Sequence, residues 1–229
     1  SSPVGFAGPK RVRAPGLSMD ELPKVDVILI SHNHYDHLDI ASLKMLQKQS
    51  NPIIIAGLGV DALLKSEGFD RVVSLDWWES HSVANIKYTF TPCRHFSGRG
   101  LFDRNQTLWG AFVVESREKK IYFGGDTGYG KHFSMVAKKF GPMDLAFIPI
   151  GAYEPRWVMK DVHLNPKEAI TAHLDLQSKR SVGIHFGTFD DLTDEGINEP
   201  ATELAKERKK QAIADDEFIT PKFGQSYRL

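Results

Sequence analysis

One short stretch, residues 31–39, constrains the fold of this chain more than any other feature. It contains His32, His34, Asp36 and His37, so that four metal-capable side chains fall within six residues. The stretch follows directly on the apolar run 25–30, which is typical of a buried strand. The cluster is therefore expected where a strand ends and a loop begins, which is where α/β folds place their chemistry.

The spacing of this cluster indicates metal binding. In an extended chain the side chains at i and i+2 point the same way, so His32 and His34 can hold one ion from one side. Asp36 and His37 lie past the bend and are free to face a second ion. The alternative, a polar surface loop, is disfavoured because crowding so many titratable groups without a cation is costly.

Composition describes an ordinary soluble globular protein with one sizeable core or at most two small ones, since 41% of its 229 residues are hydrophobic and 25% are charged. No apolar run is long enough to span a bilayer. Lysine plus arginine equals aspartate plus glutamate at 29 each, so no global field attracts nucleic acid, and no nucleic-acid partner is expected. The single cysteine, Cys93, excludes an internal disulfide and fits a cytoplasmic location.

The first part of the chain, residues 1–24, carries four prolines and is expected to run as an extended loop over the surface. It has neither an initial methionine nor the apolar segment of a signal peptide, and it resembles the middle of a longer chain. A basic cluster at residues 8–13, with Arg11 and Arg13, has two interpretations. It is either a substrate contact or a solvated loop, and the loop is favoured.

The remaining pattern predicts alternating helices and strands, followed by an antiparallel region. Strands are expected at residues 25–30, 53–56 and 71–75, with helices between them from about 39 and from 60 to 67. Antiparallel strands are expected at 86–91, 108–115 and 120–123. Helices at 132–140, from 165 to about 177 and at 200–212 then alternate with strands at 144–150, 181–184 and 217–220. The second of these helices has strong start signals, with Asn165 as N-cap, Pro166 at the first position and Glu168 at the third.

Three further metal-capable residues, His95, Asp126 and His185, also lie at or just after predicted strand ends. The glycines around Asp126 match the spacing of no phosphate-binding loop, so we interpret them as a sharp turn that presents this carboxylate inward. Seven ligands are too many for one tetrahedral ion, but they suit two ions with one shared carboxylate. The absence of cysteine ligands indicates an open catalytic site rather than a closed structural zinc site.

The ordered set H-x-H-x-D-H, a lone histidine, an aspartate in G-G-D-T-G and a final histidine resembles the ligand set of the metallo-β-lactamase superfamily. The resemblance covers nearly the whole chain and implies a single domain, residues 1–229, folded as an αββα sandwich with a dinuclear site at its strand ends. Residues 31–39, 75–79, 123–129, 148–157 and 185–189 further resemble the branch of N-acylphosphatidylethanolamine-hydrolysing phospholipase D. In that branch another strand precedes the stretch resembling residues 2–13, so the first strands of the sandwich are expected to be missing here.

The resemblance implies two Zn²⁺ per chain, with Mn²⁺ or Fe²⁺ as alternatives. The implied ligands are His32, His34 and His95 for one ion, Asp36, His37 and His185 for the other, and Asp126 as the bridge. The implied activity is cleavage of a lipid phosphodiester by a metal-bridging hydroxide.

Asp36 and Asp126 are therefore catalytic candidates, together with His163, which resembles a family histidine near the substrate phosphate. His163 could donate a hydrogen bond or a proton to the leaving oxygen, or it could be structural, since it lies just upstream of a helix cap. Val162 stands where animal members have a glutamine, and this difference leaves the head-group contacts open.

Candidate substrate contacts are Arg94, Arg99, Tyr153, Arg156 and Trp77, and Trp78 and Trp157 are further possible walls for acyl chains. Arg156 has a competing interpretation as a structural residue that pairs with Glu154 or another nearby carboxylate. A small molecule or a phospholipid is the expected substrate, and peripheral membrane contact and a homodimer are further possible associations.

Two other function classes are open. The first is a superfamily hydrolase for another bond, such as a lactone or a nucleic-acid phosphodiester; the ligands alone do not separate it from a lipid phosphodiesterase. The second is a non-catalytic binding scaffold, which is disfavoured because no ligand of the set is missing.

Overall fold

The structure is a computed structural model that describes residues 9, 11–189 and 193–227. The N-terminal part alternates strands and helices as predicted. β1 (Val27–Ile30), α1 (Ile40–Ser50), β2 (Ile53–Gly57), α2 (Val60–Ser66) and β3 (Val72–Leu75) form a parallel sheet in the order β1-β2-β3. The helix predicted near residue 39 begins there, because the side chain of Asp39 accepts a hydrogen bond from the Ala41 amide.

The second sheet has seven strands in the order β10-β9-β8-β7-β6-β5-β4. Its strands are β4 (Ser80–Val83), β5 (Ile86–Thr91), β6 (Ala111–Glu115), β7 (Lys120–Phe123), β8 (Leu145–Pro149), β9 (Ser181–Ile184) and β10 (Phe218–Ile219). β4 to β7 pair antiparallel, whereas β7 to β10 pair parallel. β4 was not predicted, because it lacks an apolar run and gains its strand conformation from pairing with β5.

Three helices cover the outer face of the large sheet, namely α3 (His132–Phe140), α5 (Pro166–Asp175) and α6 (Glu199–Lys210). α5 begins with the predicted signals: the Asn165 side chain accepts from the Glu168 amide, and the Glu168 carboxylate accepts from the Asn165 amide. The short helix α4 (Arg156–Met159) was not predicted, since four residues carry no helical period.

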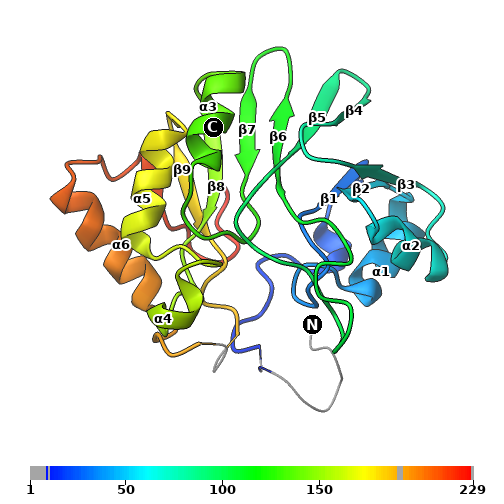
Figure 1. The fold of residues 1–229 in the computed structure, drawn as a ribbon, viewed down its shortest axis with the longest axis horizontal. Coiled ribbons are helices and arrows are strands. Elements are labelled where there is room, and N and C mark those ends of the chain that lie inside the picture. Colours follow the sequence, from blue (N-terminus) through cyan, green and yellow to red (C-terminus); the bar gives the residue numbers. More distant parts are fainter. Residues whose placement is uncertain (1–8, 10, 190–192, 228–229) are drawn as a thin grey trace.

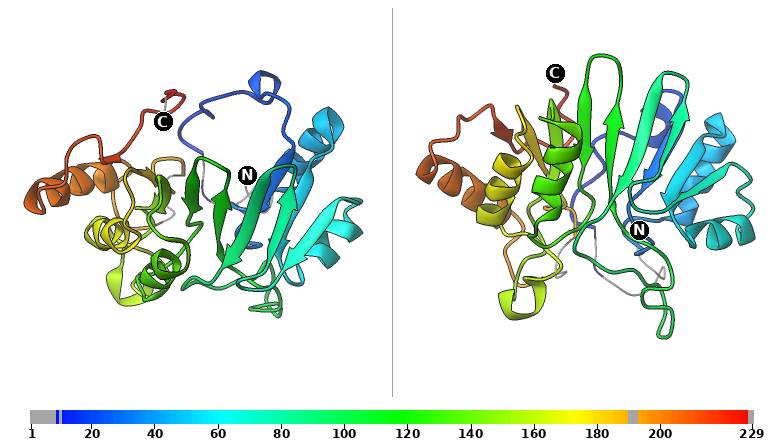
Figure 2. Two further views of the ribbon diagram at one scale, coloured as in Figure 1. Left: turned by 90° about the horizontal axis from the view of Figure 1, so that it is seen from above. Right: turned by 45° about the horizontal axis from the view of Figure 1, so that its top comes forward.

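The two sheets face each other, with helices outside both, as Figures 1 and 2 show. Between the sheets, side chains such as Ile55 and Leu75 pack against Phe90 and Phe112. A second cluster lies between β1–β3 and α1 and α2, and the largest lies between the seven-stranded sheet and its helices. The predicted αββα sandwich is therefore confirmed.

The N-terminal segment is less extended than predicted. A 3₁₀ helix, η1 (Met19–Glu21), interrupts it after Ser18. Arg11 forms an isolated antiparallel bridge with Phe189, and the Val12 amide donates to the Thr188 carbonyl at 3.0 Å. Residues 1–8 and 10 lie outside the described residues, so the expectation for them stays a prediction. Within the described ranges, no helix combines the length and the apolar character needed to cross a membrane.

Candidate metal centre

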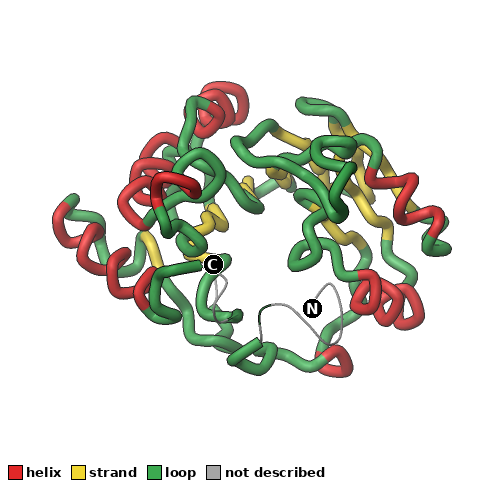
Figure 3. The backbone as a smooth tube through the Cα atoms, turned by 60° about the horizontal axis from the view of Figure 1, so that its bottom comes forward, coloured by secondary structure: helices red, strands yellow, loops and turns green. Residues whose placement is uncertain are grey.

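Four strand ends deliver the predicted ligands to one place. β5, β7 and β9 point in the same direction within the large sheet, so their carboxyl ends meet at one edge. The loops after these strands carry His95, Asp126 and His185, while the loop after β1, residues 31–39, comes from the other sheet. Figure 3, viewed toward this end, shows that it is built from loops.

Unusual backbone conformations at Gly125 and His185 orient the candidate ligands Asp126 and His185. Gly125 has a φ of 59°, and a Cβ at this position would lie 2.5 Å from the Cβ of Ser31, so only glycine fits here. This confirms the sharp turn that presents Asp126. His185 also has a positive φ, 58°, which costs a non-glycine residue about 1–3 kcal/mol and is typical of functional sites.

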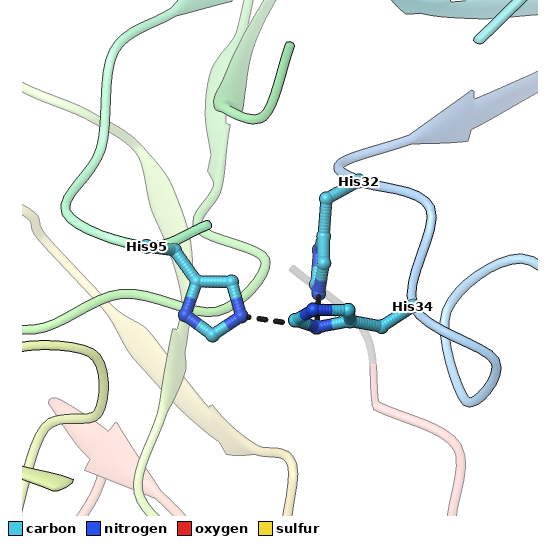
Figure 4. A group of neighbouring side chains, drawn as sticks. All are labelled: His32, His34 and His95. Atoms are coloured by element: carbon cyan, nitrogen blue, oxygen red, sulfur yellow. Dashed lines mark hydrogen bonds between the residues drawn. The ribbon is translucent and has the colours of Figure 1, made fainter. Parts of the chain in front are cut away.

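The first group of candidate ligands consists of three imidazoles. Nε2 of His32 lies 2.8 Å from Nδ1 of His34, which lies 3.3 Å from Nε2 of His95. Figure 4 shows these rings turned toward one another, two from the loop after β1 and one from the loop after β5. Nδ1 of His95 donates to the Val162 carbonyl at 3.0 Å, which leaves the Nε2 lone pair directed into the cluster.

The second group contains two carboxylates and two imidazoles: Asp36, His37, Asp126 and His185. Oδ2 of Asp36 lies 3.4 Å from Nε2 of both His37 and His185. Oδ2 of Asp126 lies 3.0 Å from His37 and 3.4 Å from His185. The same oxygen lies 3.9 and 3.8 Å from Nε2 of His32 and His95, so Asp126 reaches both groups.

The electrostatics of the two groups differ. In the first group, burial lowers the pKa of all three histidines, with that of His95 falling to about 3. These imidazoles are therefore neutral at pH 7, which is the form that binds a metal. In the second group, burial opposes the charged forms, but the facing charges outweigh it: the pKa of His37 rises to about 10, and that of Asp126 falls well below its ordinary value.

The donor set fits divalent ions. Within each group, one ligand atom from every residue lies within 4.8 Å of the others. Among the described residues, Oδ1 of Asp126 and Nδ1 of His185 are buried without a hydrogen-bond partner. Buried polar atoms are rarely left unpaired in folded proteins, and these nitrogen and oxygen donors are those that zinc and similar metals prefer.

His163 lies beside both groups, and with His95 and Asp126 it forms a third set of side chains that could hold a metal. Its ring stacks on that of His185 with centroids 5.6 Å apart and meets that of His95 edge-on at 5.2 Å. Burial lowers its pKa to about 4, and its Nδ1 is buried without a hydrogen-bond partner in the described part of the chain. A neutral imidazole with a free nitrogen is thus available beside the candidate ligands.

The predicted arginine contacts are engaged elsewhere. Nη2 of Arg156 donates to both carboxylate oxygens of Glu168 at 2.9 and 2.8 Å, and Nη1 donates to the His163 carbonyl at 3.0 Å. Arg94 pairs with Asp161 at 2.6 Å and donates to the Tyr129 carbonyl. For Arg156, this geometry favours the competing structural role.

The predicted aromatic contacts are also satisfied within the protein. The Tyr153 side chain is buried, and its hydroxyl donates to Glu199 at 3.2 Å. Nε1 of Trp77 donates to the Trp109 carbonyl at 2.7 Å, and the two indole rings meet edge-on. Tyr153 therefore contacts the start of α6 and Trp77 contacts the loop before β6, whereas their direct contact with a substrate stays a prediction.

A pocket of about 240 Å³ opens beside the second group, and its lining includes Asp36 and His185 together with Arg11, Phe186, Phe189 and Ile197. The Arg11 guanidinium lies 5.3 Å from the centroid of the Phe189 ring and has no carboxylate partner among the described residues. Sequence reasoning favoured a solvated loop for Arg11. The basic cluster pointed to this region, but the sequence does not show that Arg11 pairs with Phe189, which lies 178 positions further along the chain.

Comparisons with known proteins agree with this geometry. The family model described as "Beta-lactamase superfamily domain" matches residues 2–186. The chain is 38% identical to N-acyl-phosphatidylethanolamine-hydrolyzing phospholipase D 1 of Caenorhabditis elegans, across 97% of this chain and 66% of that protein. It thus spans less than two thirds of that relative's length.

Two further comparisons concern proteins of more similar size. A UPF0173 metal-dependent hydrolase of Solibacter usitatus is 30% identical, across 76% of this chain and 72% of that protein. The crystal structure of isothiocyanate hydrolase from Delia radicum gut bacteria superposes with a TM-score of 0.73, covering 98% of this chain and 87% of that one at 22% identity. At that identity the likeness concerns the fold alone.

Proposed function

The chain belongs to the β-lactamase superfamily of metal-dependent hydrolases, and from this premise we propose that it is a dinuclear zinc phosphodiesterase of the N-acylphosphatidylethanolamine phospholipase D type, acting on a lipid phosphodiester. The observation that carries the proposal is the position of Asp126. One buried carboxylate oxygen lies within 3.9 Å of four imidazole nitrogens from both ligand groups, which suits two ions that share a bridge.

Bound to these two groups, divalent cations would lower the pKa of water toward neutrality and offset the negative charge of a phosphodiester. The chain's own residues contribute the remaining elements. Hydrogen bonds from behind fix the ring orientation of ligands such as His95. The role proposed for the neutral His163 is to donate a hydrogen bond from its free Nδ1 to the leaving oxygen.

A lipid substrate is supported by apolar side chains at the rim of the site. Leu101 and Phe102, in the loop that follows His95, are 91% and 95% exposed, and Trp157 in α4 is 88% exposed. In the views of Figures 1 and 2 this loop and α4 both project beyond the ligand-bearing ends of the strands. Exposed large apolar groups around a site are typical of surfaces that contact a membrane or a partner.

A substrate panel tests the proposal. The protein, loaded with zinc, is assayed on N-acylphosphatidylethanolamine, a soluble aryl phosphodiester and an acyl-homoserine lactone, each with and without a chelator. We expect chelator-sensitive cleavage of the two phosphodiesters, and in isotopically labelled water the label should enter the phosphoryl product. Cleavage of the lactone alone would assign the protein to the competing class, and label in the leaving alcohol would mean attack at carbon.

A further inference from the structure

Arg99 directs its guanidinium to the ligand loop, the stretch of residues 31–39 that carries four candidate ligands. Its Nη1 donates to the carbonyls of Asn33 and Leu38, each at 2.8 Å. The guanidinium carbon lies 3.9 Å from the centroid of the Tyr35 ring. One side chain therefore contacts the ligand loop at three points.

These contacts lie at the two ends of the turn that carries the ligands. Asn33 separates His32 from His34, and Leu38 directly follows His37. The same Nη1 bonds both carbonyls and so sets the separation of the two chain segments that leave the turn. Arg99 itself follows His95 by four residues, so it joins a ligand from the large sheet to the ligand loop of the small one.

Hydrogen bonds fix the backbone on either side of Arg99. The Asp103 carboxylate accepts from the amides of Arg99 and Gly100 at 2.9 and 2.7 Å. The Gly98 amide donates to Oδ1 of Asn33 at 2.7 Å, which adds a second bond between the two loops. The position of Arg99 is thus determined from both sides.

We propose that Arg99 is a positioning residue that holds the ligand loop in register with His95, so that both ligand groups are formed before the ions bind. Lysine cannot replace it, because an ammonium lacks the planar face that stacks on Tyr35 and is more strongly hydrated than a guanidinium. Residues that orient metal ligands from behind usually change metal affinity by 10- to 100-fold when mutated.

Because Arg99 is positively charged, a positioning role and a purely electrostatic role predict opposite changes in metal affinity when it is removed. A guanidinium beside a cation site repels the ions, so charge alone would make its removal strengthen metal binding. Positioning predicts the opposite result. The inference rests on the metal-binding part of the proposed function and is independent of the substrate.

The test measures Co²⁺ binding to the full chain by competition with a chromogenic chelator, and the visible absorption spectrum of the bound Co²⁺. We expect Arg99→Lys and Arg99→Ala to weaken Co²⁺ binding about 10- to 100-fold and to alter the spectrum. The control is Arg117→Ala, which removes an exposed arginine in the turn between β6 and β7 that makes no described bond to the ligand loop. It should stay within about two-fold of the wild type.

Thermal unfolding of the metal-free proteins identifies variants that fail to fold. If the Arg99 variants do not fold, Tyr35→Leu replaces them in the test, because it removes only the partner on which the guanidinium stacks. We expect it to weaken Co²⁺ binding about two- to five-fold. Wild-type affinity in Arg99→Lys, tighter binding in Arg99→Ala, or an unchanged Tyr35→Leu when the arginine variants do not fold would overturn the inference. A wild-type protein that binds no Co²⁺ would instead contradict the proposed function.

Discussion

The interior of the site and its rim depart from ordinary burial in opposite directions. Inside, His32, His95 and Asp126 are polar or charged and almost fully buried. At the rim, Phe102 and Trp157 are large and apolar, yet nearly fully exposed. Folded proteins usually bury apolar groups and expose charged ones, so each departure costs stability unless something else compensates.

Both departures occur at the same end of the strands, and this coincidence is informative. The rim segments adjoin interior residues in the sequence: the loop with Phe102 begins after His95, and α4 is followed within four residues by His163. They are joined by the hydrogen bond from His95 to Val162 and by the pair of Arg94 with Asp161. A buried polar interior suited to metal ions and an exposed apolar rim together favour a substrate that is ionic at one point and apolar at another.

The strongest test of the interior is Asp126→Asn, which keeps the shape of the side chain and removes its charge. We expect affinity for both ions to fall by two powers of ten or more, since removing one partner from a buried charge network costs about 3–5 kcal/mol. Activity should fall to background. Elemental analysis after dialysis measures the metal content.

Single-histidine variants serve as matched controls for Asp126→Asn. His34→Ala affects only the first group and His185→Ala only the second, so each should retain about one ion per chain if the two groups act as separate sites. An Asp126→Asn protein that retains two ions while His34→Ala loses both would contradict a bridging role for the aspartate.

Arg156→Ala tests the contacts that connect α4, at the rim, to His163 in the interior. The Arg156 and Glu168 side chains are only 24% and 22% exposed, and a bond to a charged group contributes about 1.5–3 kcal/mol, so the melting temperature should fall by about 3 to 10 °C. Activity should decline on all substrates alike, because the lost bond to the His163 carbonyl loosens that residue.

Lys167→Ala, an exposed position in the same helix as Glu168, is the control for Arg156→Ala and should leave the melting temperature unchanged. If Arg156→Ala melted normally and lost activity only on anionic substrates, the arginine would instead contact the phosphate directly.

The rim is expected to give the smallest effect. Phe102→Ser and Trp157→Ser should each reduce sedimentation with phosphatidylcholine–phosphatidylglycerol vesicles by about five- to ten-fold, which corresponds to partial burial of one aromatic side chain. Metal content and cleavage of a soluble phosphodiester should not change. Leu174→Ser, which removes an apolar side chain 49% exposed on α5, is the control. Equal vesicle binding by all these proteins would show that the rim does not contact lipid.

Local signals account for most of what could be predicted from the sequence. The apolar run before His32, the Asn165 cap and the turn at Gly125 each depend on a few neighbouring residues, and the structure confirms these elements. Each candidate ligand follows a strand, which is where α/β folds place their chemistry, and this was enough to predict that they share one site. The elements that were missed, β4 and α4, are short and lack an internal period.

The sequence by itself therefore indicated the seven clustered candidate ligands, because residue type and strand position already restrict them, and its resemblance to the superfamily implied the sandwich. Only the tertiary structure decided the partners of the arginines. Arg99 bonds carbonyls 61 and 66 positions away, Arg94 pairs with Asp161 at a separation of 67, and Arg11 meets Phe189 across the chain. A guanidinium suits a carboxylate, a carbonyl or a phosphate equally well, so its role depends on which of these groups the fold brings within reach.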